Sequence, residues 1–265
     1  MNLRLVRLGH CAAAAAAVFA VVSGSRPAAA APEMRALSLV EEISTTPARR
    51  PALRQDLASV QLRRLERWRE RGILKSYRLL FNRFADTGSW DAVEVLTFAD
   101  PAAAARWARI ERAAPAGLDP RALSLATELR STPSDLARRG GADADAGAGP
   151  FLVIPYEALV SLPEYERYFD GYTLPQLSGW SDEGVLGGFE LHLARYAAGR
   201  PWSAMLVLRY RGEDALDRRE AVVAKVRRDL AADPAWKAFS DDKKAIRTEK
   251  QLAVADELGA GGRGK

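Results

Sequence analysis

The sequence predicts an α+β fold: a tandem duplication of one β-α-β-β-α-β unit, whose two antiparallel sheets pack together as a barrel within one chain. Three observations predict it. The chain has 265 residues, of which 48% are hydrophobic and 28% charged, and this is enough for two ordinary domains with their own cores. One stretch of the sequence recurs at a fixed spacing, and each copy alternates between strand-like and helix-like patterns.

The repeat aligns residues 68–98 with residues 180–210 without a gap, at the constant offset that separates Trp68 from Trp180. The identical pairs are Trp68/Trp180, Gly72/Gly184, Leu74/Leu186, Leu79/Leu191, Arg83/Arg195, Ala85/Ala197, Trp90/Trp202, Ala92/Ala204, Val95/Val207 and Leu96/Leu208. Two tryptophan pairs in register, with this many identities around them, are more than chance alignment gives. The sequence therefore predicts an internal duplication.

Each copy gives the same order of elements. In the first copy we expect a strand over 37–43, a helix over 50–71, strands over 74–84 and 91–98, a helix over 101–113 and a strand over 123–129. In the second we expect a strand over 151–156, a helix over 163–180 that stops at Gly184, strands over 189–196 and 202–210, helices over 214–231 and 235–240, and an edge strand over 251–258.

The domain boundaries follow from composition. Residues 138–149 are rich in glycine, alanine and aspartate and offer little side chain to bury, which predicts a flexible linker. The last residues, 259–265, have a similar composition and predict a flexible tail. The two ferredoxin-like repeats are therefore expected over 34–137 and 150–258.

Residues 1–30 have the pattern of a secretory signal peptide. Arg4 and Arg7 precede an apolar stretch over 12–22, and small residues over 28–31 predict cleavage after Ala30. This stretch is shorter than the roughly 20 apolar residues that span a bilayer, so no membrane association is expected after cleavage. The sequence predicts an exported protein, either periplasmic or secreted.

Cleavage at this position changes which chemistries are available. The formal charge falls from +5 to +2, because three arginines and no acidic residue are removed; no sustained basic block remains, and we expect no nucleic-acid partner. Cys11 and His10 are lost, which leaves no thiol and His192 as the single imidazole. Disulfides, zinc–thiolate sites and cysteine nucleophiles are excluded for the mature chain, and no P-loop, G-x-G-x-x-G, G-x-S-x-G or H-E-x-x-H motif is present.

The order of elements, and the W-x-x-x-G-x-L sequence that precedes each hairpin, resemble the dimeric α/β-barrel superfamily in its fused, two-repeat form. The resemblance covers nearly all of the mature chain. It implies a sheet from each repeat facing the other, so that a monomer or a weak homodimer is expected. Members of the superfamily include cofactor-free monooxygenases, haem-handling enzymes, muconolactone-isomerase-like enzymes and proteins with no known activity.

Strand alternation predicts which side chains face a cavity between the sheets. Phe189, Leu191 and Leu193 are apolar and should face the helices, so the residues between them should face inward. Charged side chains on an inner face need partners, a ligand or water. The expected catalytic pair is His192 and Glu190, and the expected ligand-binding residues are Arg78, Asn82, Phe84, Glu94 and Tyr196.

Three functions remain open. The first is an exported protein that binds a small, partly apolar molecule in the cavity. The second is a monooxygenase- or isomerase-type enzyme in which His192 serves as a general base or, if haem is bound, as its axial ligand; otherwise no cofactor or metal is expected. The third is a structural or interaction protein whose barrel is filled and in which His192 is a satisfied core residue.

Overall fold

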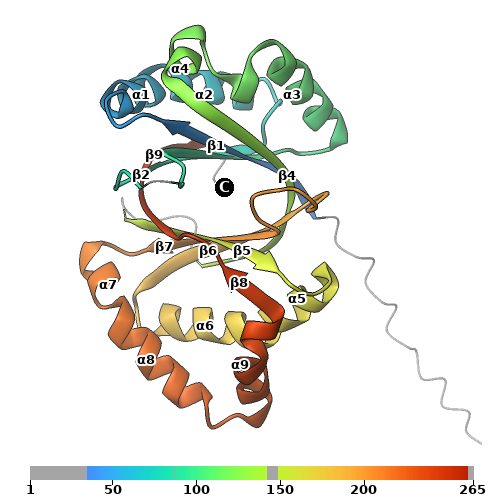
Figure 1. The fold of residues 1–265 in the computed structure, drawn as a ribbon, viewed down its shortest axis with the longest axis vertical. Helices are drawn as coiled ribbons and strands as arrows, with labels where there is room; N and C mark the ends of the chain where they lie inside the picture. Colours follow the sequence, from blue (N-terminus) through green and yellow to red (C-terminus); the bar gives the residue numbers. More distant parts are fainter. Residues whose placement is uncertain (1–34, 87, 142–148, 262–265) are drawn as a thin grey trace, which may run out of the picture. The chain divides into compact units, whose positions relative to one another are not determined.

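Strands and helices follow one another along the chain largely in the predicted order (Figure 1). Three details differ: a helix occupies Pro120–Leu125, where a strand was expected from 123; a short strand over Arg247–Glu249 was not expected; and the last strand, expected at an edge, lies between two others. The computed structural model describes residues 35–86, 88–141 and 149–261. The predicted signal peptide (1–30), most of the predicted linker (142–148) and the end of the predicted tail (262–265) lie outside the described residues.

The first repeat consists of β1 (Ala36–Thr45), α1 (Arg50–Asp56), a π-helical turn (Leu57–Gln61), α2 (Leu62–Glu70), β2 (Ser76–Asn82), β3 (Ala92–Thr97), α3 (Pro101–Ala113), a 3-10 turn (Pro115–Gly117), α4 (Pro120–Leu125) and β4 (Ala126–Gly141). The second consists of β5 (Phe151–Ala158), α5 (Leu162–Tyr168), a π-helical turn (Phe169–Thr173), α6 (Leu174–Asp182), β6 (Leu186–Ala194), β7 (Ala204–Tyr210), α7 (Glu213–Asp217), α8 (Arg219–Leu230), α9 (Pro234–Ile246), β8 (Arg247–Glu249) and β9 (Ala253–Gly261).

The first long helix of each repeat is interrupted at the same place. The π-helical turns over Leu57–Gln61 and Phe169–Thr173 are separated by the same offset as Trp68 and Trp180. A π-helical turn is rare and adds a residue to a helix without breaking it. The duplication therefore extends into the helices, beyond the stretch where sequence identity is visible.

Within the described residues, eight strands form one closed antiparallel ring, in the order β7-β6-β4-β1-β3-β2-β9-β5 with β5 returning to β7. Each repeat contributes four neighbours, β4-β1-β3-β2 and β9-β5-β7-β6. The two sheets join edge to edge where β4 pairs with β6 and where β9 pairs with β2. The prediction of a barrel within one chain is confirmed, and the ring is closed without strands from a second copy.

Ion pairs also cross between the repeats at equivalent places. Arg83, which follows β2, pairs with Asp256 of β9 at 2.8 Å, and Arg195, which follows β6, pairs with Asp135 of β4 at 2.7 Å. Asp256 lies opposite Phe81 in the same way that Asp135 lies opposite Leu193, the equivalent of Phe81 in the second repeat. The fourth strand of each repeat is thus fixed to the second strand of the other by both backbone and side chains.

The predicted linker begins too early. β4 continues through residues 138–141, where it pairs with β6, and β9 likewise includes 259–261 of the predicted tail. A Cβ on Gly140 would lie 2.4 Å from Cε1 of Phe189, and one on Gly141 would lie 2.4 Å from Cα of Gly188. These glycines allow two strands to approach closely, whereas their composition alone suggested flexibility.

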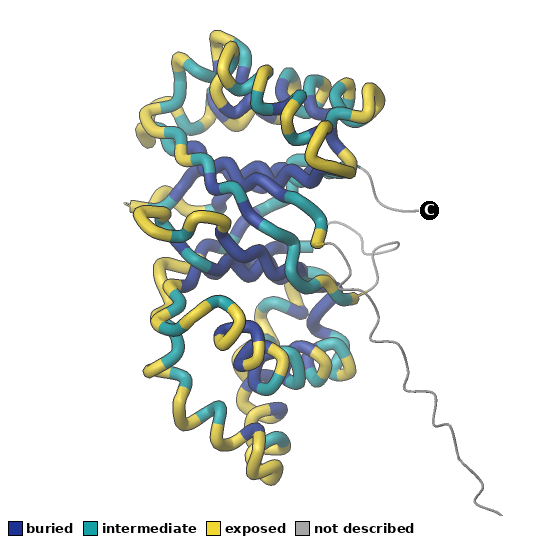
Figure 2. Tube along the Cα trace, turned by 90° about the vertical axis from the view of Figure 1, so that its right-hand side faces the viewer, coloured by how far each residue is buried: buried dark blue, intermediate teal, exposed yellow. Residues whose placement is uncertain are grey.

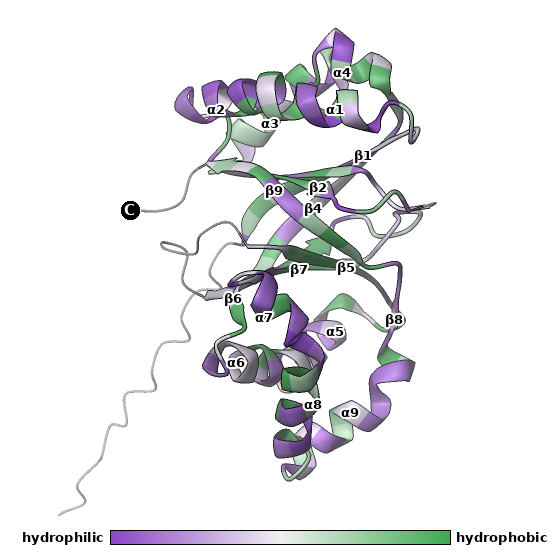
Figure 3. Ribbon diagram, turned by 90° about the vertical axis from the view of Figure 1, so that its left-hand side faces the viewer, coloured by the Kyte–Doolittle hydropathy of each residue, from purple (hydrophilic) through white to green (hydrophobic). Residues whose placement is uncertain are grey.

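Helices cover the barrel on two opposite sides, those of the first repeat on one side and those of the second on the other (Figure 1). The strands are largely buried, and hydrophobic residues concentrate on them while the outer helix faces are hydrophilic (Figures 2 and 3). Each repeat has a core between its helices and its strands, and a third core of aliphatic and aromatic residues fills part of the barrel. No helix in the described part of the chain is long and apolar enough to cross a membrane.

Candidate functional site

The alternation predicted for β6 and β2 is correct. Leu191 and Leu193 belong to the core under the helices of the second repeat, and Phe189 packs against it. Glu190 and His192 lie between them on the opposite face, inside the barrel, where Arg78 of β2 meets Glu190 at 2.9 Å. The structure therefore brings three of the predicted site residues together.

These side chains form a continuous polar network. Arg78 also approaches Glu257 at 3.3 Å, Glu190 accepts a second bond from Arg139 at 2.9 Å, and His192 Nε2 lies 3.4 Å from Glu190 Oε2. Burial opposes the ionisation of Glu190, but the adjacent Arg78, together with His192 and Arg139, holds its pKa well below the usual range. Glu190 is therefore a permanent carboxylate at neutral pH, which suits an ion pair and not a proton donor.

The duplication explains why the pair exists. Arg78 and Glu190 are equivalent positions of the two repeats that carry opposite charges and meet across the barrel. Leu80, the equivalent of His192, is apolar and fully buried. The two copies thus differ at facing positions in a way that gives a complementary pair of charges.

His192 is a satisfied core residue in this arrangement. Its side chain has no exposed surface, its Nδ1 lies 3.1 Å from Ser38 Oγ, and Ser38 bonds Ser134 at 2.8 Å. A carboxylate only accepts hydrogen bonds, so in the neutral ring Nε2 carries the proton toward Glu190 and Nδ1 accepts from Ser38. Every polar atom of the ring has a partner.

A haem bound through His192 would need a free ring nitrogen and open space beside it. Both nitrogens have partners and the ring has no exposed surface; the space of about 10 Å³ beside Arg78 and Glu190 is not bordered by His192. The residues around His192 therefore do not fit haem.

Four further predictions concern individual side chains. Asn82 lies inside the barrel as expected, where its Nδ2 donates to the carbonyl of Trp90 at 3.1 Å, so that its amide is committed to the backbone. Phe84 and Tyr196 were expected on the inner face, but both follow the ends of their strands and are 58% and 80% exposed. Tyr196 takes a positive φ of 56°, which turns the chain away from the strand direction.

Glu94 was also expected inside the barrel, and this placement is wrong. In the strand register Glu94 lies opposite Leu79 of β2 and Glu41 of β1. Leu79 faces the helices, so Glu94 lies between the sheet and the helices of the first repeat. Burial raises its pKa to about 8, against the opposing effects of Gln61 and Arg64. Its sequence context, Ala-Val-Glu-Val-Leu, is apolar on both faces and gives no alternation to follow.

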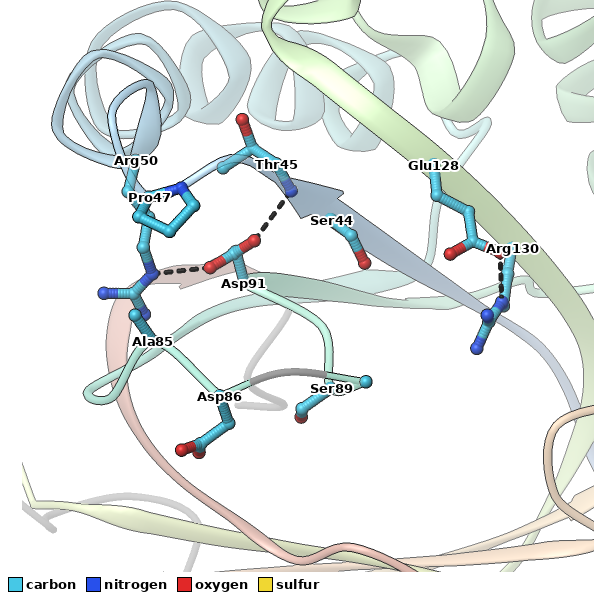
Figure 4. A pocket seen from close by; sticks show the side chains of 11 residues that line it. Ser44, Thr45, Pro47, Arg50, Ala85, Asp86, Ser89, Asp91, Glu128 and Arg130 are labelled. Atoms are coloured by element: carbon cyan, nitrogen blue, oxygen red, sulfur yellow. Dashed lines mark hydrogen bonds and ion pairs between the residues drawn. The ribbon is translucent and has the colours of Figure 1, made fainter.

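An open site lies at one end of the barrel, where both tryptophans of the pair Trp90 and Trp202 are found. We call this the tryptophan end. One pocket of about 260 Å³ is bordered by Glu42, Ser44, Gly88, Ser89, Trp90, Arg130, Pro155, Pro201, Trp202, Lys250 and Gln251. A second pocket of about 240 Å³ shares Ser44, Gly88, Ser89 and Arg130 with the first and therefore adjoins it (Figure 4).

Hydrogen bonds to an aspartate fix the wall of the second pocket. Asp91 accepts from the backbone N–H of Thr45 at 2.7 Å and from Arg50 Nε at 2.5 Å (Figure 4). Arg50 also donates to the carbonyl of Asn82 at 2.5 Å. These bonds tie the end of β1, the start of α1 and the β2–β3 connection together, so this side of the tryptophan end has a defined shape.

Glu42 is the titratable group of the tryptophan end. It lies on β1 with 8% of its surface exposed, and Trp202 Nε1 donates to its Oε2 at 3.3 Å. Burial raises the pKa of Glu42 to about 7, although the Trp202 N–H and the positive charge of Arg130 favour its ionised form. A carboxyl that is half ionised near neutral pH and borders a pocket has the properties of an acid–base group.

Glu42 was not among the site residues predicted from the sequence, although a signal was present. Leu37, Leu39 and Ile43 are the apolar residues of one face of β1, so period 2 places Glu42 on the other face, toward the barrel interior. The adjacent Glu41 obscured this pattern, because it puts a second buried carboxyl on the helix-facing side.

Neither a family model nor a curated protein sequence matches the chain. Several solved structures are similar to it in fold. An anthrone oxidase-like protein superposes with a TM-score of 0.54 at 15% identity, over 88% of this chain and 95% of its own. Proteins proposed to be monooxygenases from Lactobacillus acidophilus and Fusobacterium nucleatum both superpose with a TM-score of 0.52 at 12% identity, over 87% of this chain and 97% and 95% of theirs.

Identities this low show the fold alone. They agree with the expectation drawn from the repeat, because these neighbours are dimeric α/β-barrel proteins. The chain has the α/β-barrel fold in its fused, two-repeat form, built by one polypeptide.

Proposed function

We propose that the protein binds a small, partly apolar molecule at the tryptophan end and that Glu42 exchanges a proton with it. One observation carries this proposal: a nearly buried carboxyl with a pKa of about 7 borders an open pocket of about 260 Å³. Proton exchange is most effective when the pKa of the group lies near the working pH. Glu42 thereby takes the role that the sequence suggested for His192.

The lining of the pocket indicates the class of molecule. Trp90, Trp202, Pro155 and Pro201 supply flat apolar surface, which favours a planar ligand. Arg130 and Lys250 lie at the same rim, where Arg130 is paired with Glu128 and Lys250 with Glu157; their N–H groups can still donate to a ligand oxygen once its proton has left. A phenol or an enol of one or two rings combines these properties.

Two outcomes can follow deprotonation. The proton taken from the hydroxyl can return from Glu42 to a carbon atom, which converts the phenol or enol to its keto isomer with no other reactant. Alternatively, dioxygen can oxidise the phenolate to a quinone: one oxygen atom enters the ring, and the other leaves as water with the two hydrogens that the substrate loses. The fold shared with an anthrone oxidase-like protein and with proteins proposed as monooxygenases favours the second outcome by analogy. Neither outcome calls on haem at His192.

We also propose that the protein works outside the cytoplasm, as the signal-like residues 1–30 suggest. Fractionation of source cells followed by N-terminal sequencing tests this. A mature protein that begins at Ala31 in the exported fraction supports it, and an intact Met1 in the cytoplasm contradicts it.

A structural role is the second candidate, because the network around His192 and Glu190 is filled and partnered. In that case the tryptophan end would bind nothing. The two candidates differ in whether Glu42 responds to a ligand.

Tryptophan fluorescence with 1-naphthol as the probe separates them. We expect quenching that saturates, with an affinity that changes with pH around a midpoint near 7. Glu42→Gln should remove the pH dependence and weaken binding about tenfold, whereas Glu220→Gln, a control on the exposed face of α8, should bind as the wild type does. Oxygen uptake in the same samples distinguishes oxidation from isomerisation. Absence of saturable quenching would support the structural candidate.

A further inference from the structure

A second polar cluster lies on the face of β5 opposite to the tryptophan end, between the strands and the helices of the second repeat. It consists of Arg247, the first residue of β8, with Tyr156 of β5 and Tyr165 and Tyr168 of α5. The Arg247 guanidinium lies 4.0 Å from the ring centre of Tyr156 and 5.5 Å from that of Tyr168. The guanidinium is thus surrounded by aromatic surface.

The polar atoms of this cluster lie near one another without forming a full hydrogen bond. Arg247 lowers the pKa of both phenols as a nearby donor does, yet none of these contacts has hydrogen-bond geometry. Among the described residues, Nη1 of Arg247 and the hydroxyls of Tyr165 and Tyr168 have no hydrogen-bond partner, although the two tyrosines are 0% and 1% exposed. Buried hydroxyls without partners are uncommon and costly in folded proteins. Each phenol oxygen could also accept from the guanidinium, but neither does so with hydrogen-bond geometry, and an acceptor that all three donors reach would satisfy them together.

The charge of the cluster points the same way. Within the described residues, burial and the three tyrosines have the largest effects on the pKa of Arg247, and no carboxylate is among these effects. Burial raises the pKa of Tyr165 and Tyr168, while the nearby Arg247 opposes this, so the phenols stay protonated at neutral pH and do not neutralise the cation. In this part of the structure, the cluster therefore carries a positive charge that its own members do not balance.

The first repeat supplies an internal comparison. Tyr165 corresponds to Leu53 in the alignment of the two repeats, and Tyr156 lies opposite Ala204 as Ile43 lies opposite Ala92. Leu53 and Ile43 are fully buried and fill the same layer with aliphatic side chains. The fold therefore does not require hydroxyls at these positions.

We propose that Arg247, Tyr165 and Tyr168 form a binding site for the carboxylate group of a small molecule. A carboxylate matches the planar guanidinium fork and carries one negative charge for one buried cation, whereas a phosphate dianion would leave excess negative charge. Arg247 is the partly exposed member of the cluster although its Nη1 atom is buried, so the ligand has to approach along the Arg247 side chain. This site lies on the outer side of the second sheet and does not depend on the function proposed for Glu42.

Thermal denaturation and calorimetric titration of the mature protein with sodium benzoate test this proposal, with sodium chloride and sodium phosphate at equal ionic strength beside it. We expect benzoate to raise Tm in a concentration-dependent way and phosphate to have a smaller effect. Tyr165→Phe should keep the ring and weaken benzoate binding about threefold to tenfold. Arg247→Met should weaken it about tenfold or more.

Tyr210→Phe is the matched control, because the Tyr210 hydroxyl is buried but already bonded by Arg219 at 3.0 Å. It should leave benzoate binding unchanged. A wild-type Tm that is identical in benzoate and chloride would overturn the proposal, as would equal losses in Tyr165→Phe and Tyr210→Phe. Equal stabilisation by phosphate would overturn the preference for a carboxylate. Should Arg247→Met fail to fold, the two tyrosine variants still decide.

Discussion

Replacing Glu42 by glutamine should change how the stability of the protein depends on pH. The pKa of Glu42 is about 7 in the folded protein and 4.5 in the reference state, so the folded state binds more protons between these values. Since the unfolded chain then holds fewer protons, the free energy of unfolding falls as pH rises through this window. At pH 8 the buried Glu42 carboxylate therefore lowers the free energy of unfolding of the wild type by about 3 kcal/mol. This cost is about 2 kcal/mol smaller at pH 5.5.

Urea denaturation of the wild type and Glu42→Gln, from pH 5.5 to pH 8, measures this cost. We expect the stability difference between them to shift by about 2 kcal/mol in favour of the variant as pH rises, since glutamine does not titrate. The control Glu220→Gln should track the wild type at every pH. A difference between Glu42→Gln and the wild type that is the same at pH 5.5 and pH 8 would refute the reasoning.

Three more substitutions probe other parts of the account. Glu94→Leu, which introduces the residue found at the equivalent Leu206, should stabilise the protein by about 4 kcal/mol at pH 7.5 in urea denaturation; destabilisation would mean that the carboxyl has a partner in solution. His192→Leu should lower the free energy of unfolding by about 1–3 kcal/mol, because Ser38 and Glu190 lose a partner, but keep 1-naphthol binding within twofold of the wild type. Loss of binding by a folded variant would mean that the ligand binds in the barrel interior, beside His192. Gly141→Ala should lower Tm by an amount equivalent to about 1–3 kcal/mol, because Gly141 has a φ of 94° and its Cβ would lie 2.4 Å from the backbone Cα of Gly188; an unchanged Tm would mean that 138–141 does not pair closely with β6.

The repeat made the fold predictable. Its constant offset identified two equal units, and the element order in each unit indicated a sheet with one face left to cover, which the other unit supplies. The sequence did not show that the ring closes through pairing of β4 with β6 and of β9 with β2. Part of the segment that closes one side of the ring, 138–141, is glycine-rich and has the composition of a linker, and its pairing as a strand depends on contacts with Phe189 and Gly188.

The site was predictable where one face of a strand is apolar and the other is not. That condition holds on β6, and Glu190 and His192 were placed correctly. It fails on β3, where Glu94 stands among apolar residues on both faces, and near Glu42, where two acids are adjacent. Phe84 and Tyr196 were misplaced because alternation does not show where a strand ends.

The role of a buried charge was harder to predict than its position. Glu190 and Glu42 both lie inside the barrel, and only the three-dimensional surroundings distinguish them. Arg78 lies within 2.9 Å of Glu190 and keeps it ionised, whereas Glu42 has the weaker support of the Trp202 N–H at 3.3 Å. The first is therefore a structural ion pair and the second a group able to change its charge near neutral pH.

The most direct test of the function proposed for the tryptophan end is a carbon-detected NMR titration of the Glu42 side-chain carboxyl, with and without 1-naphthol. We expect a midpoint near pH 7 in the free protein and a clear displacement of that midpoint when the phenol is bound. A midpoint near 4.5 that 1-naphthol does not move would contradict the assignment of Glu42 as the acid–base group of this protein.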